Sequence, residues 1–198
     1  MKITSSAIAI VATITLLGGC LSLPNVADMT PQQFKDLRTS VSRDDFEKTT
    51  RIETSRIYFS KGPLPLPREA YYLIATKKDG AEISYRLMLY SENSLQRGGR
   101  PICWERAADQ EGNNFSLESN GVSVFKTLID EWSSAQVSRE YLEGIRKTGT
   151  TWRFYGRVTT TALIQSQAID GFLMKVDEVF KESRPSGYKS NNGNWLAI

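Results

Sequence analysis

The feature that most constrains the fold is an Asp79-Gly80 dipeptide between two β-rich runs, in a chain of 198 residues. Asp-Gly is the strongest short-range signal for a tight β-hairpin. The run before it, 70–76, is rich in tyrosine and aliphatic residues, and the run after it, 83–90, alternates apolar and polar side chains. Alternation places one face of a strand against a core. The sequence therefore predicts antiparallel pairing around residue 80, with Tyr85, Leu87 and Leu89 on the core face.

Further segments rich in β-branched and aromatic residues predict the remaining strands. We expect these strands over 52–60, 102–108, 115–119 and 122–132, and a hairpin of 151–155 with 158–164. The segment 62–67 is predicted to be a surface loop, because its prolines cannot donate hydrogen bonds to a sheet. The polar, glycine-bearing segment 91–100 is predicted to be a loop as well. The strands are expected to begin only after the polar stretch 39–50.

A helix is predicted to start at Pro31, because Thr30 can cap it and Gln33 stands where a capping box places Glu or Gln. This helix is expected to run to about Arg38 and to bury Phe34 and Leu37.

Two more helices are predicted later in the chain. Ser138 can cap the first, which Gly149 would end. Ser166 is expected to cap the second, whose apolar residues recur at helical spacing up to Phe180. Such a stripe is typical of a helix that packs on a sheet. Because strands and helices are segregated along the chain, we expect an α+β domain in which a curved antiparallel sheet carries helices packed on one face.

The first twenty residues have the order of a secretory signal. Lys2 precedes an apolar run over 7–17, which is too short to span a bilayer as a helix. The segment ends in Leu17-Gly18-Gly19-Cys20, which resembles the lipobox of bacterial lipoproteins. The resemblance implies cleavage between Gly19 and Cys20, a diacylglyceryl group on the Cys20 sulfur and acylation of the new amino group. The protein would then be held to a membrane through N-terminal acyl chains.

The resemblance also suggests a location. Leu21 follows the cysteine, where an Asp favours retention in the inner membrane of Gram-negative bacteria. We therefore expect the outer membrane, with the domain facing the periplasm. The expected organisation is a signal peptide over 1–19, a lipidated tether over 20–28, one globular domain over 29–184 and a flexible tail over 185–198. The apolar end of that tail, 195–198, is expected to dock on the domain; binding to something else is the alternative.

The composition argues against most catalytic sites. The chain has no histidine, which removes Ser-His-Asp and Cys-His arrangements and nearly all catalytic zinc sites. It has no phosphate-binding glycine loop either. The adjacent acidic pairs Asp44-Asp45, Asp130-Glu131 and Asp177-Glu178 are expected to be solvated, because neighbours in sequence point in different directions. We expect no enzymatic activity, no cofactor and no metal, with a hydrolase of unfamiliar site as a remote alternative.

Charge and cysteine content set two further expectations. Positive and negative residues are interspersed and the net charge is +3, so nucleic acid is not expected as a partner. Because Cys20 is assigned to lipid, Cys103 has no disulfide partner within the chain. We expect Cys103 to be a small buried apolar residue, with a reactive or cross-linking thiol as the alternative.

Aromatic residues in the predicted strands are the remaining candidates for function. Outward aromatics near Arg56, Arg86, Arg153 and Arg157 would form a binding face, whereas the alternative is that they only stabilise the sheet by cross-strand pairing. The strand-rich middle and Gly171-Phe172-Leu173 are similar to small envelope lipoproteins of unassigned function. The leading hypothesis is a lipid-anchored, non-enzymatic binding or assembly module with an envelope protein partner, using that face or the 91–100 loop. The alternative is a carrier of an apolar ligand such as lipid, held in a cavity between the sheet and the closing helix.

Overall fold

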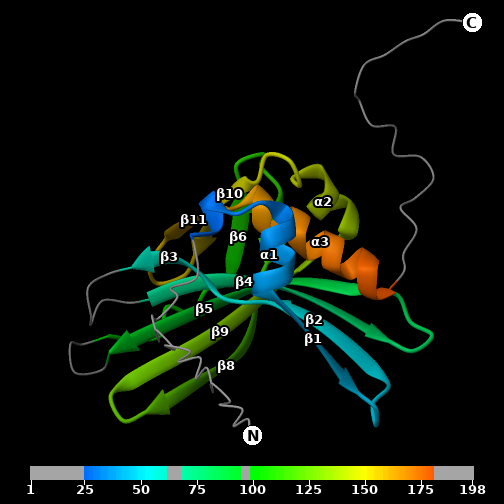
Figure 1. The fold of residues 1–198 in the computed structure, drawn as a ribbon. Coiled ribbons are helices and arrows are strands. Elements are labelled where there is room, and N and C mark those ends of the chain that lie inside the picture. Colours follow the sequence, from blue (N-terminus) through cyan, green and yellow to red (C-terminus); the bar gives the residue numbers. More distant parts are fainter. Residues whose placement is uncertain (1–24, 62–67, 95–98, 181–198) are drawn as a thin grey trace, which may run out of the picture.

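The computed structural model describes residues 25–61, 68–94 and 99–180 (Figure 1). Strands make up 51% of the structure and helices 22%, which confirms the predicted antiparallel sheet accompanied by helices. Both sheets are open. The predicted signal peptide, Cys20 and the predicted tail lie outside the described residues.

The larger sheet has seven strands in the described part of the chain. Its order is β1-β2-β4-β5-β9-β8, and β3 also pairs with β4. The strands are β1 (Thr39–Asp44), β2 (Thr49–Thr54), β3 (Ile57–Lys61), β4 (Arg68–Lys78), β5 (Ser84–Ser94), β8 (Glu118–Phe125) and β9 (Leu128–Val137). The predicted hairpin around residue 80 is confirmed: β4 pairs with β5 in a register that sets Leu73 opposite Leu87, and Gly80 adopts a φ of 77° in the turn.

The smaller sheet has the order β11-β10-β6-β7. Its strands are β6 (Arg106–Asp109), β7 (Asn114–Ser116), β10 (Thr150–Tyr155) and β11 (Thr160–Ile164). The predicted hairpin of 151–155 with 158–164 is confirmed as β10 paired with β11.

Several strand boundaries differ from the prediction. The expected strand 52–60 is divided into β2 and β3, and the polar stretch 39–50 contains the edge strand β1, which is held by its ladder to β2. The side chain of Asp44 accepts the backbone N–H groups of Phe46 and Glu47 and closes the turn between β1 and β2. Backbone pairing of this kind leaves no apolar pattern in a strand whose side chains are mostly exposed.

The expected strand 122–132 is wrong, because the chain reverses direction within it. β8 and β9 form a hairpin in which Phe125 lies opposite Leu128, and Lys126 takes a left-handed φ of 53° in the turn. A residue other than glycine rarely occupies that conformation. Because a lysine stands there instead of a glycine, the sequence does not indicate the turn. The predicted strand 102–108 begins only at Arg106, because Cys103 is also left-handed, with a φ of 54°.

The helices are η1 (Val26–Asp28), α1 (Pro31–Arg38), α2 (Arg139–Gly144) and α3 (Ser166–Phe180). The predicted capping box is confirmed: the Thr30 hydroxyl accepts the Gln33 backbone N–H, and the Gln33 side chain accepts the Thr30 backbone N–H. Phe34 is fully buried as expected, but Leu37 is 53% exposed. Ser138 caps α2 as predicted. Ser166 is the first residue of α3 rather than its cap.

The main core is a cluster of buried apolar side chains contributed by α1, α3, the large sheet and the small sheet. The Tyr85 ring meets the Phe172 ring edge-on at 6.5 Å between centroids, and both belong to the same buried cluster as Trp152. Val26 is buried in this cluster too, so the predicted tether contacts the domain through this residue. In the described ranges, no helix combines the length and apolar character needed to cross a bilayer.

Candidate functional site

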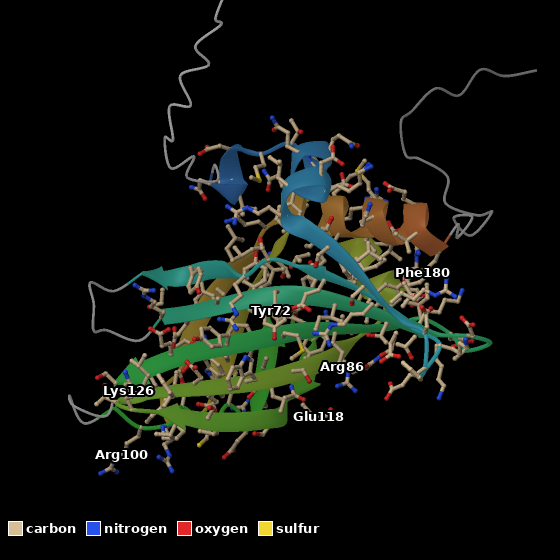
Figure 2. All side chains as sticks on the ribbon, turned by 60° about the horizontal axis from the view of Figure 1, so that its bottom comes forward. Tyr72, Arg86, Arg100, Glu118, Lys126 and Phe180 are labelled. Carbon is tan, nitrogen blue, oxygen red and sulfur yellow. The ribbon has the colours of Figure 1, made fainter. Side chains whose placement is uncertain are left out.

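A second apolar cluster lies on the large sheet, on the side opposite the main core; we call this side the aromatic face. Side chains alternate along a strand, so Tyr71 and Leu73 point into the main core, whereas Tyr72 between them points to the aromatic face. Figure 2 looks onto this face, with Tyr72 near its middle. The cluster consists of Ala70, Tyr72, Ile74, Met88 and Tyr90, with Trp132 packed against it.

An arginine side chain covers one ring of the aromatic face. The Arg56 guanidinium lies 3.7 Å from the centre of the Tyr90 ring, and the Tyr90 and Trp132 rings are 5.7 Å apart. Arg86 is exposed and pairs with Glu118 of β8 at 3.9 Å (Figure 2). Long side chains that lie along apolar surface shield it from water, which explains why Tyr90 is only 3% exposed.

Other apolar side chains on this face remain open to solvent. In the strand register Tyr58 stands opposite Ala70, and Phe125 stands opposite Leu128. Directly opposite residues share a face, so these side chains lie on the same side as the cluster. Tyr58 is 38% exposed, Leu128 39% and Phe125 66%. The aromatic face therefore joins a covered centre to exposed apolar groups nearer its rim.

The phenols of this face act as neutral hydrogen-bonding groups. Burial, with Glu53 adding to it, raises the pKa of Tyr72. Burial and the hydrogen bond to Asp130 raise the pKa of Tyr90. The Tyr90 hydroxyl lies 2.8 Å from Asp130 and 3.2 Å from Glu92. Phenols held in the protonated form are poor nucleophiles and poor bases at neutral pH.

The charges around the aromatic face are of both signs. Arg51 pairs with Glu53 at 2.8 Å, and Arg86 and Arg56 stand among the carboxylates already described. A face that carries both signs of charge is better suited to contact another protein than to contact a uniformly anionic partner.

The structure brings together only part of the predicted binding residues. Arg56 and Arg86 lie on the aromatic face, whereas Arg153 is exposed on β10 and Arg157 lies in the segment between β10 and β11 of the other sheet. The position of Trp132 on this face was not predicted, because residues 122–132 were expected to form a single strand. Five aromatic residues of the predicted strands lie in the main core, as the alternation of side chains along a strand leads one to expect: Tyr71, Tyr85, Trp104, Trp152 and Phe154.

Two expectations about single residues need correction. Glu131 is not solvated, since it is 2% exposed, and its carboxylate accepts the backbone N–H groups of Ile102 and Cys103. Cys103 is half-buried rather than buried and is a free thiol. Gly19 and Cys20 lie outside the described residues, so the structure gives no geometry for the lipidation site.

The space between the large sheet and α3 is filled by side chains. Phe172, Leu173, Leu87 and Phe34 are each no more than 2% exposed there. Hollows lie instead at the margins of the domain, one of them lined by Glu69 and Arg157 and another by Leu37 and Arg56.

Among the described residues, no group of three or more aspartate, glutamate or cysteine side chains is placed to hold a metal ion. Comparisons of the chain with protein families, with curated proteins and with solved structures found no match.

Proposed function

We propose that this protein is a lipid-anchored, non-enzymatic binding module that recognises an envelope protein on the periplasmic side of the bacterial outer membrane. Its anchor would be acyl chains on Cys20, following the lipobox resemblance of Leu17 to Cys20. The helices would all be grouped on the core side of the sheet, which would leave the aromatic face free for the partner.

The observation that carries the binding proposal is the stacking of Arg56 on Tyr90 beside Trp132. Tyrosine, tryptophan and arginine are enriched in the residues that dominate protein interfaces. The exposed Tyr58, Phe125 and Leu128 add apolar surface near the same face, and the mixed charges supply complementarity without attracting nucleic acid.

Photo-crosslinking tests the binding surface. A benzophenone amino acid in place of Arg86 lies on the aromatic face, and the matched control replaces Leu163, which is 55% exposed on β11 of the other sheet. We expect a reproducible protein adduct from position 86 in intact cells and none from position 163. The adduct should weaken when Tyr58→Ala is added. Equal adducts from both positions, or none from position 86, would contradict the proposal.

Cell fractionation tests the anchor. Cys20→Ser should release the protein from membranes, because two or more acyl chains are needed for stable attachment. Cys103→Ser is the control and should leave the protein in the membrane fraction. Mass spectrometry of the N-terminus should show an acylated Cys20. An unmodified Cys20 in membrane-bound protein would contradict this part of the proposal.

A further inference from the structure

A hollow of about 280 Å³ lies on the side of β4 opposite the aromatic face. Its wall includes Glu69 from β4, Arg100 and Ile102 from the segment before β6, and Arg157 and Val158 from the segment between β10 and β11. The charged groups thus come from segments that are far apart in the sequence. Arg100 lies toward the same end of the large sheet as Lys126 in Figure 2.

Glu69 is the unusual member of this hollow. It is 5% exposed, and in the described part of the chain its carboxyl takes part in no hydrogen bond or ion pair. Burial raises its pKa to about 7. A largely buried carboxyl without a protein partner is costly to ionise, and a ligand in the hollow can supply the partner.

We propose that this hollow binds a small ligand that carries a carboxylate and a short apolar chain. The protonated Glu69 carboxyl donates a hydrogen bond to one ligand oxygen, and the guanidinium groups of Arg100 and Arg157 supply positive charge. Ile102 and Val158 form an apolar wall for the chain. A ligand amine is disfavoured because two arginines line the same hollow. A water molecule occupies about 30 Å³ in the liquid, so the hollow has the volume of roughly nine waters. A ligand that fills it would have on the order of ten non-hydrogen atoms.

The binding should depend on pH through Glu69. In the strand registers it faces Ser60 of β3 and Ser91 of β5, neither of which titrates in this range. Beyond Ser91 stands Glu131 of β9, whose two oxygens are already occupied by the backbone of Ile102 and Cys103. Among the described residues that line the hollow, the other charged groups are the two arginines. Ionisation of Glu69 therefore places a negative charge beside the ligand carboxylate and weakens binding as the pH rises.

Titration of the purified full-length protein with hexanoate, followed by ¹H–¹⁵N NMR, tests the proposal. A carboxyl with a pKa of about 7 is some 90% protonated at pH 6 and 10% at pH 8, so the Kd should rise about ninefold between these values. Glu69→Gln should bind at both pH values with a Kd ratio near one, because the neutral amide still donates. Hexylamine should not bind.

Arginine variants separate the site from general charge effects. Arg157→Ala should weaken hexanoate binding at least fivefold at both pH values, and Arg153→Ala, outside the hollow on β10, should leave it unchanged. Arg100→Ala serves as a second variant if Arg157→Ala alters the fold. Absence of hexanoate binding, a pH-independent Kd in the unmodified protein, or equal binding of hexylamine would each overturn the proposal. None of these results bears on the membrane anchor or the aromatic face.

Discussion

The Glu131 carboxylate accepts the backbone N–H of Cys103 at 2.7 Å. Its second oxygen accepts the N–H of Ile102 at 2.6 Å. This pair of hydrogen bonds joins β9 to the segment before β6, where Cys103 has left-handed backbone. Gly156 packs against the same segment so closely that a Cβ on it would lie 2.7 Å from the carbonyl oxygens of Ile102 and Cys103. One buried carboxylate thus fixes the link between the two sheets.

Glu131→Gln should therefore destabilise the protein. The amide oxygen accepts one N–H, but the amide nitrogen then faces the other donor, and a buried polar group left unpaired costs about 1–3 kcal/mol. Urea denaturation followed by circular dichroism measures the loss. The control is Glu118→Gln, because the Glu118 side chain is 70% exposed. Equal midpoints for the two variants would show that Glu131 does not hold this segment.

Tyr141→Phe should also lower stability. The Tyr141 hydroxyl accepts the indole N–H of Trp152 at 2.7 Å and donates to Asp109 at 3.0 Å. Its removal leaves the buried indole N–H without an acceptor, at a cost of about 1–3 kcal/mol. Tryptophan fluorescence during urea denaturation reports the change. Tyr58→Phe, at an exposed position, should have little effect; a similar loss in both variants would contradict this account.

Glu69 should make the stability of the protein depend on pH. Its pKa is about 7 in the folded state against an ordinary value of 4.5, so the folded state holds a proton that the unfolded state has lost between these values. The contribution of the protonated Glu69 carboxyl to the free energy of unfolding is complete below pH 4.5. It is lost as the pH rises through 7. We expect about 1–2 kcal/mol after allowance for solvent in the hollow.

The measurement compares Glu69→Gln with the unmodified protein between pH 5 and pH 8. Because the chain has no histidine, few other groups titrate in this range. The variant should lose most of the decline in stability toward pH 8. An unchanged slope would assign the decline to other groups.

Gly171→Ala and Gly144→Ala should have opposite effects. A Cβ at Gly171 would lie 2.6 Å from the Pro31 carbonyl oxygen and 2.9 Å from the Phe34 ring, whereas one at Gly144 meets nothing within 4 Å. Overpacking between α1 and α3 should cost about 2–3 kcal/mol. At Gly144 alanine should stabilise α2 by about 0.5 kcal/mol. Thermal unfolding of both variants checks the pair, and a Gly171→Ala protein as stable as the parent would refute the close approach.

The features predicted correctly from sequence are those that a few neighbouring residues decide. The Thr30–Gln33 capping box and the Asp79-Gly80 turn are complete within four residues. The apolar spacing of α3 marks its buried side in the same local way. Leu37 was predicted wrongly because helical spacing alone does not say where the covering element ends.

The candidate site depends on contacts that no local pattern carries. Trp132 lies beside Tyr90 because the chain turns at Lys126 between β8 and β9. That turn contains no glycine or proline, so it could not be predicted from the sequence. Glu131 was expected to be solvated like its neighbour Asp130, since the backbone donors that it meets come from residues 102 and 103. The hollow around Glu69 combines three segments, so its existence follows only from the folded chain.

The contact of α1 with Gly171 has a consequence for how the domain is completed. Phe34 is synthesised early in translation, but the helix that covers it begins only at Ser166. At 5–20 residues per second, the roughly 130 residues between them take on the order of ten seconds to synthesise. For that time Phe34 of α1 lacks the helix that covers it in the finished domain. Closure by α3 makes the finished domain a product of nearly the whole polypeptide, and a chain that stops before α3 leaves its interior open.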